Sequence, residues 1–203
     1  MKTLKEFLVF LYEQTEPEFS LERLKSLSTF REVLIYLERN FGQPTSEGSS
    51  RKTWIVTDKL IVKVVKLKSN VSQNVTEVKN TRCLGPRFSV VLHDYDQINH
   101  FWLLEEKLEP VTEEEFVSYF NDKLGTSFTN GWSISSLFLL ITQNRDGMPQ
   151  EKAIMKKLLE TNKWFQEFSK AIMDCQVQSW DFKSTNWGIR PSTGEVVLLD
   201  LGF

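Results

Sequence analysis

The sequence predicts an α+β fold of two lobes, with a small antiparallel sheet in the first lobe and mostly helices in the second. Three observations predict it. Helical spacing and capping residues mark the first forty residues and those after 112, short β-rich runs mark the stretch between them, and two further β-rich runs close the chain. Apolar residues make up 40% of the 203 residues, which is enough for the chain to bury a core of its own.

Residues 1–41 are predicted to form a helical extension. Helical spacing places on one face of a first helix Leu4, Phe7, Leu8 and Leu11. Ser20 can cap a second helix, and Thr29 with Glu32 makes a capping box at the start of a third. The apolar run Phe7–Tyr12 is shorter than the roughly 7–15 residues that a signal peptide needs.

Residues 42–109 are predicted to form the sheet lobe. After a loop rich in Gly, Ser and Thr, the runs Thr53–Val56 and Leu60–Val65 indicate a hairpin. A helix is predicted over Val71–Leu84, because a Gly-Pro pair follows it and ends it. Two more strands are expected in "FSVVLHDYD" and "HFWLLEEKL".

Residues 110–203 are predicted to form the helical lobe. Thr112 and Glu115 make a second capping box. One long helix with a single buried stripe is predicted from positions that alternate spacings of four and three, namely Ile154, Leu158, Thr161, Phe165, Phe168, Ile172 and Cys175. The runs Trp187–Ile189 and Val196–Leu199 then form a closing hairpin.

Composition limits the functional classes. The formal net charge of −2 argues against non-specific nucleic-acid binding, which needs a basic face. No stretch approaches the roughly 18 apolar residues of a membrane span, so no membrane partner is expected. Cys83 and Cys175 are far apart in apolar surroundings and are predicted to be buried free thiols, which fits a reducing compartment and a cytoplasmic location. His93 and His100 show no metal-ligand spacing.

Several polar residues stand in apolar or turn contexts. Asp181 and Asn186 are spaced as D-x-x-x-x-N, and Asp200 follows the last predicted strand. Lys63 interrupts a strand that reads as buried on both faces, and a buried ammonium needs a partner. Each has a simpler interpretation: the Asp and Asn as turn caps, Lys63 as a surface residue, Glu77 as a solvated helix residue, and Asp200 as a cap at the chain end.

Taken in order, these motifs resemble those of protein kinases and their relatives over about residues 40–203. "DFKSTNWGI" is similar to the catalytic loop, and Asp200-Leu201-Gly202 to the metal-binding D-F-G. "LIVKVVK" is similar to the strand that carries the nucleotide-binding lysine, "QNVTEVKN" to the helix with its glutamate partner, "WLLEEKLEPV" to the hinge, and "EGSSRKTWIV" to the Gly-rich loop. The reduced layout is similar to that of phage-encoded and bacterial kinase-like proteins.

The resemblance implies ATP and Mg²⁺ as cofactors and a role for each matching residue. Asp181 would be the base, and the other catalytic residues would be Lys183, Lys63 and Glu77. The nucleotide would be held by Gly48, Ser49, Ser50, Lys63, Glu106 and Leu108. The metal ligands would be Asn186 and Asp200.

The chain departs from the family at three places. The H-R-D motif reads Ser179-Trp180-Asp181, the Gly-rich loop is poor in glycine, and the sequence stops at Phe203 where the family continues into an activation segment. Two functions therefore stand as expectations. One is a kinase that transfers the γ-phosphoryl group of Mg-ATP to a protein hydroxyl. The other is a pseudokinase scaffold that modulates a partner or host protein, with the N-terminal helices either as the partner surface or packed on the sheet.

Overall fold

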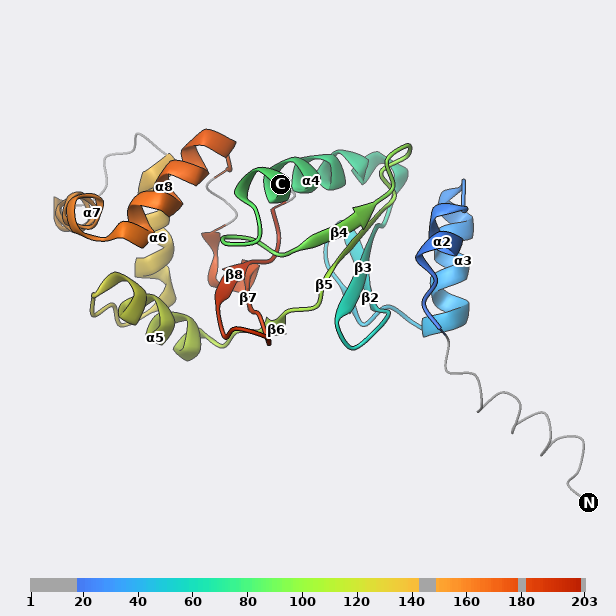
Figure 1. The fold of residues 1–203 in the computed structure, drawn as a ribbon, viewed down its shortest axis with the longest axis horizontal. Helices are drawn as coiled ribbons and strands as arrows, with labels where there is room; N and C mark the ends of the chain where they lie inside the picture. The colour runs from blue at the N-terminus through green and yellow to red at the C-terminus, as the bar shows by residue number, and fades with distance from the viewer. Residues whose placement is uncertain (1–17, 143–148, 179–181, 202–203) are drawn as a thin grey trace, which may run out of the picture.

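The computed structural model describes residues 18–142, 149–178 and 182–201. It has an α+β architecture with a small antiparallel sheet and several helices, as the sequence predicted. Figure 1 shows helices α2 and α3 at one end of the molecule, helices α5 to α8 at the other, and the larger sheet with helix α4 between them. The helix predicted near Leu4 lies outside the described residues, as does Asp181, the predicted catalytic base.

The two described N-terminal helices begin at the predicted caps. Helix α2 (Leu21–Lys25) is capped by Ser20, and helix α3 (Phe30–Phe41) begins with the complete Thr29–Glu32 capping box. Both pack on one face of the larger sheet, where their fully buried side chains Leu24, Val33 and Leu37 meet Trp54, Val62 and Val64. Of the two roles expected for the N-terminal helices, a partner surface or packing on the sheet, the apolar faces of α2 and α3 have the second.

The larger sheet has five strands in the order β1-β2-β3-β5-β4, with all neighbours antiparallel. The strands are β1 (Ser46–Glu47), β2 (Arg51–Ile55), β3 (Leu60–Val65), β4 (Leu92–Tyr95) and β5 (Trp102–Glu106). Strand β2 begins two residues earlier than predicted. A short 3₁₀ helix η1 (Lys68–Asn70) leads into helix α4 (Val71–Leu84), which has the predicted bounds and ends at Gly85.

The helical part is built around aromatic side chains. Its helices are α5 (Glu113–Leu124), α6 (Gly131–Thr142), α7 (Pro149–Thr161) and α8 (Lys163–Cys175). Phe120 lies at the centre, with its ring 5.2 Å from that of Phe138 and 4.9 Å from that of Trp187. Such edge-on contacts add to the stability that burial of the rings provides.

The prediction of one long helix over residues 154–175 is wrong, because the chain breaks at Asn162. This residue leaves the helical conformation, and its side chain accepts a hydrogen bond from the Phe165 N–H, which caps helix α8. The Asn162 amide also donates to the Lys123 carbonyl at 2.9 Å. Asparagine is a preferred N-cap residue, so a local capping signal interrupts a hydrophobic stripe that continues across the break.

A three-stranded sheet in the order β6-β7-β8 joins the helical part to the rest of the molecule. Strand β6 (Glu109–Pro110) follows β5 closely, and strands β7 (Trp187–Ile189) and β8 (Val196–Leu198) form the predicted hairpin. A 3₁₀ helix η3 (Ser184–Asn186) precedes β7. Gly188 is required in β7, because a Cβ atom there would lie 2.7 Å from the Cβ atom of Leu108.

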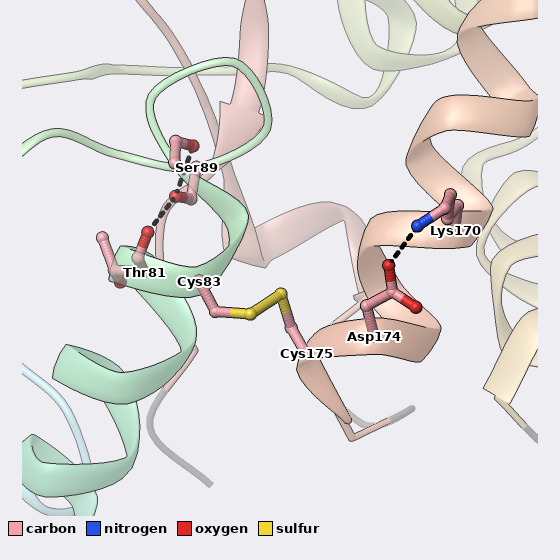
Figure 2. Close-up of a disulfide and its surroundings, with 7 residues drawn as sticks. Thr81, Cys83, Ser89, Lys170, Asp174 and Cys175 are labelled. Carbon is pink, nitrogen blue, oxygen red and sulfur yellow. Dashed lines mark hydrogen bonds and ion pairs between the residues drawn. A yellow bond between two sulfur atoms is a disulfide. The ribbon is translucent and has the colours of Figure 1, made fainter.

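The prediction of free thiols is also wrong. Cys83 near the end of α4 and Cys175 at the end of α8 form a disulfide with their Cα atoms 5.6 Å apart (Figure 2). The two residues are 92 positions apart in sequence, so only the packing of α4 beside α8 brings them together. The disulfide removes the thiol-based reason for a reducing compartment, and the cytoplasmic location stays a prediction. Among the described residues, no helix is both long and apolar enough to cross a membrane.

Candidate functional site

A cavity of about 470 Å³ lies between the larger sheet and the C-terminal hairpin. This volume falls within the usual range of small-molecule sites, roughly 300–1,000 Å³. The cavity is lined by residues from strands β1 to β3, from the β5–β6 connection and from the segments flanking the hairpin. Seven of the residues predicted for nucleotide and metal binding are among them: Gly48, Ser49, Ser50, Lys63, Leu108, Asn186 and Asp200.

Lys63 is the central cation of this site. It lies on the middle strand of the sheet, and the residue is only 6% exposed. Its Nζ atom lies 2.6 Å from Oε1 of Glu77, 2.8 Å from Oε2 of Glu105 and 2.8 Å from the carbonyl oxygen of Leu199, to which it donates a hydrogen bond. The sequence-based reading of a buried lysine that needs a partner is therefore correct.

Strand alternation explains why the charged groups gather on one face of the sheet. Successive side chains of a strand point to opposite faces, so Ile61 and Lys63 share a face while Val62 and Val64 point toward α2 and α3. Trp54 of β2 is fully buried on the apolar face, which places Arg51 on the face of Lys63.

The same alternation applies to the neighbouring strand β5. Leu103 pairs directly with Lys63, and Ile61 pairs with Glu105, so Glu105 is a diagonal neighbour of Lys63 on the same face. Trp102 and Leu104 point to the apolar face and pack with the N-terminal helices.

Glu77 comes to the same point from helix α4. Its side chain is fully buried, which excludes the simpler interpretation of a solvated helix residue. One carboxylate oxygen accepts a hydrogen bond from Lys63, and the other contacts Arg51. A buried carboxylate is costly unless it is paired, so the contact with Lys63 offsets the cost of burying the two charges.

Arg51 and Glu105 are functional-site residues that the sequence analysis missed. Arg51 is 7% exposed and contacts both Glu77 and Asp200 through its guanidinium group. Glu105 is fully buried, and Lys63 is its cationic partner among the described residues. A signal was present in "RKTWI": the large apolar Trp54 marks the face of β2 that packs against apolar side chains, and Arg51, three residues earlier, falls on the opposite face, which is that of Lys63. We refer to Arg51, Lys63, Glu77, Glu105 and Asp200 as the charge cluster.

The loop between β1 and β2 forms the roof of the cavity. The Gly48 N–H donates to the Arg51 carbonyl at 2.9 Å, which closes a tight turn. Neither Ser49 nor Ser50 donates its backbone N–H to a backbone oxygen of the described residues. These two N–H groups can therefore donate to an anion at the cavity, as oriented loop amides do in phosphate sites.

The C-terminal segment supplies the acceptor groups. The Leu199 N–H donates to the Asn186 carbonyl at 2.8 Å, which holds the segment before Asp200 against η3. The side chain of Asn80 on α4 donates to the Leu201 carbonyl at 3.0 Å and fixes the other side. Asp200 is thus held between two hydrogen-bonded neighbours, and its side chain is 31% exposed.

Three predicted residues that the structure describes do not line the cavity: Glu77, Glu106 and Lys183. Glu77 instead pairs with Lys63. The carboxylate of Glu106 accepts three hydrogen bonds from Arg190 and one from the Val91 N–H, and this arrangement joins β5 to the C-terminal hairpin. The hydrogen bonds to Glu106 raise the pKa of the Arg190 guanidinium above its ordinary value. Lys183 is exposed and directly precedes η3.

No family model matches this chain. A search of curated proteins finds no significant match either. Any function for the chain therefore rests on the geometry and chemistry of the site.

A metal ion at this site would have to be held jointly with a ligand. Among the described residues, no three His, Cys, Asp or Glu side chains gather as a self-sufficient metal site. Asn186 and Asp200 nevertheless line one cavity, and the amide oxygen of Asn186 and the carboxylate of Asp200 are oxygen ligands of the kind that Mg²⁺ takes. Mg²⁺ is typically bound by one or two protein oxygens together with substrate phosphates and water, so these two residues would suffice.

Proposed function

We propose that the chain is a reduced kinase-like protein that binds Mg-ATP in the cavity and transfers the γ-phosphoryl group to a protein hydroxyl. One observation carries the proposal: Lys63, which is paired with the buried Glu77 at 2.6 Å, lines the same cavity as Asn186 and Asp200. A strand lysine paired with a glutamate of the next helix, opposite an Asn and an Asp, is the arrangement that protein kinases need.

The two-lobed reading is part of the same proposal. The five-stranded sheet with α4 would be the first lobe, and helices α5 to α8 with the three-stranded sheet would be the second (Figure 1). The short connection from β5 to β6 would be the hinge. Support comes from the cavity, which is lined by Lys63 and Ile61 from one side and by Asn186 and Asp200 from the other.

Each part of the nucleotide has chemically suitable residues. The base would lie against the apolar side chains of Ile61 and Leu108, which line one part of the cavity. Lys63, held by Glu77, would bind the α- and β-phosphates, and the N–H groups of the loop 48–50 would cover them. Asn186 and Asp200 would hold Mg²⁺, which when bound neutralises charge on the phosphate oxygens.

The proton of the acceptor hydroxyl would pass to Asp181. Its neighbour Phe182 is fully buried in the aromatic core, and the Trp187 indole N–H donates to the Phe182 carbonyl at 3.5 Å. A carboxylate within hydrogen-bond reach of a substrate hydroxyl can act as its general base, which is the role proposed for Asp181. Lys183 follows in the sequence, is exposed, and would balance the charge of the γ-phosphate.

A pseudokinase scaffold is the second candidate, and one contact favours it. Arg51 contacts both Glu77, the proposed partner of Lys63, and Asp200, the proposed metal ligand, so both acids already have Arg51 as a cationic partner within the chain. A protein that keeps these acids paired could bind a partner protein without transferring phosphate.

The decisive experiment combines ligand stabilisation with phosphoryl transfer. If Mg-ATP binds, saturation at about 100 times Kd should stabilise the fold by about 2.7 kcal/mol and raise Tm by roughly 5–10 °C. Wild type with γ-labelled ATP and cell lysate should label itself or other proteins. Asp181→Asn should bind Mg-ATP and transfer nothing, whereas the exposed control Asp174→Asn should behave as wild type.

The outcomes separate the candidates. Absence of any Tm shift with Mg-ATP would exclude nucleotide use. If Mg-ATP binds but wild type neither transfers phosphate nor hydrolyses ATP, and if the effect of the protein in its cell is the same with Asp181→Asn, the scaffold function is established. Phosphoryl transfer that wild type and Asp174→Asn carry out and Asp181→Asn does not would support the kinase.

A further inference from the structure

Arg51 is a buried cation that the proposed reaction does not use. It is the first residue of β2 and directly follows the loop 48–50. Its side chain is 8% exposed, and its two terminal nitrogens contact two different carboxylates, those of Glu77 and Asp200. The residue therefore links the acid that orients Lys63 to the acid assigned to the metal.

The charge balance of the cluster explains why Arg51 must be paired. With ordinary charges, the charge cluster holds two cations, Arg51 and Lys63, against the three carboxylates of Glu77, Glu105 and Asp200. A guanidinium cannot lose its proton in a protein, so a buried one needs carboxylate partners. Of its two partners, Glu77 is fully buried while Asp200 is partly exposed to the cavity.

We propose that Arg51 occupies Asp200 in the empty protein, and that it exchanges this carboxylate for the phosphates when the nucleotide binds, which frees Asp200 for a divalent cation. A guanidinium and a divalent cation on one carboxylate repel each other, so the metal must displace Arg51 from Asp200. The planar guanidinium matches phosphate oxygens with two parallel hydrogen bonds, and Arg51 lines the cavity beside the phosphate loop. Arg51 is therefore a positioning residue that couples metal binding to nucleotide binding.

This inference rests on the proposed nucleotide site, and its test uses binding rather than turnover. The whole chain is titrated with MgCl₂ alone, with ATP in EDTA, and with Mg-ATP, and binding is measured by calorimetry and by Tm. The variants are Arg51→Gln, which removes the charge, and Arg51→Lys, which keeps a charge that cannot bridge both acids. The control is Lys52→Gln, which removes a charge from the next residue of β2, on the face opposite Lys63.

The expected result is a pair of opposite shifts. In Arg51→Gln, the Kd for Mg²⁺ alone should fall about tenfold, because Asp200 loses a competing charge-assisted contact. The Kd for ATP in EDTA should rise about tenfold, because one phosphate ligand is lost. Arg51→Lys should lie between wild type and Arg51→Gln in both titrations, and Lys52→Gln should match wild type. A residue with only a structural role would not shift the two ligands in opposite directions.

Failure of the inference is distinguishable from failure of the function. If wild type does not bind Mg-ATP, the proposed function fails. If wild type binds Mg-ATP but Arg51→Gln and wild type bind Mg²⁺ alone equally, only the exchange is overturned. Should Arg51→Gln not fold, Arg51→Lys decides: an unchanged Kd for both Mg²⁺ and ATP in EDTA overturns the exchange.

Discussion

Replacing Lys63 with Met tests whether the charge cluster holds the fold together. Met has a similar length and no charge, so Lys63→Met removes the cation while it fills most of the space. Glu77 keeps Arg51 as a partner, but Glu105 is fully buried and loses its cation. Breaking a buried pair by removing one partner costs about 3–5 kcal/mol. The free energy of unfolding of a whole domain is only about 5–15 kcal/mol, so the variant should lose a large share of its stability.

Urea unfolding followed by tryptophan fluorescence measures this cost. Lys63→Met should lose about 3–5 kcal/mol of unfolding free energy, which corresponds to a Tm lower by roughly 6–20 °C. The double variant Lys63→Met/Glu105→Met removes both charges and should recover most of the loss, because a buried pair can be replaced by apolar side chains at little cost. Neither variant should bind Mg-ATP. The control Lys59→Met, in the exposed turn before β3, should match wild type.

Two results would refute the reasoning. If Lys63→Met unfolds at the same urea concentration as wild type, the lysine is not a buried partner of Glu105. If the double variant is no more stable than the single one, the destabilisation does not arise from the unpaired carboxylate.

Three further predictions follow from other parts of the molecule. Reduction of Cys83–Cys175 opens a link between residues 92 positions apart and should cost about 2–5 kcal/mol; equal urea midpoints with and without reductant would contradict the disulfide. Gly188→Ala places a Cβ atom 2.7 Å from that of Leu108, so it should lose about 1–3 kcal/mol and weaken Mg-ATP binding, and wild-type stability would refute the close contact. Hydrogen bonds from the capping threonine lower the pKa of Glu115, so the stability they provide is present above a glutamate's ordinary pKa and is lost as pH falls through the lowered one. The urea midpoint should therefore fall more between pH 5 and pH 3 (roughly either side of the ordinary glutamate pKa) for wild type than for Glu115→Gln, and equal losses would count against this role.

Local signals predicted much of the fold. The capping boxes at Thr29 and Thr112 and the Gly-Pro pair after residue 84 each act within a few residues, so the sequence alone contains their geometry. The strand that carries Lys63 could be read as buried because its neighbours are apolar on both sides. The motifs, taken in their order along the chain, predicted one common site, and seven of the predicted residues line one cavity.

The misses all depend on contacts between distant residues or on competition between two signals. At Asn162 a capping preference competes with a continuous hydrophobic stripe, and the periodicity alone does not show which signal wins. The disulfide depends on how α4 packs beside α8. Alternation along β2 indicates the face on which Arg51 lies, but Arg51 and Glu105 reach Lys63 only through the registers of β2 and β5 with β3.

A crystal structure of the whole chain with Mg²⁺ and an ATP analogue whose γ-phosphate cannot be transferred would test the central claim most directly. The account predicts the triphosphate between Lys63 and the loop 48–50, with the metal ion bound to Asn186 and Asp200. An analogue bound elsewhere, or a triphosphate that contacts neither Lys63 nor a metal ion at Asp200, would contradict it.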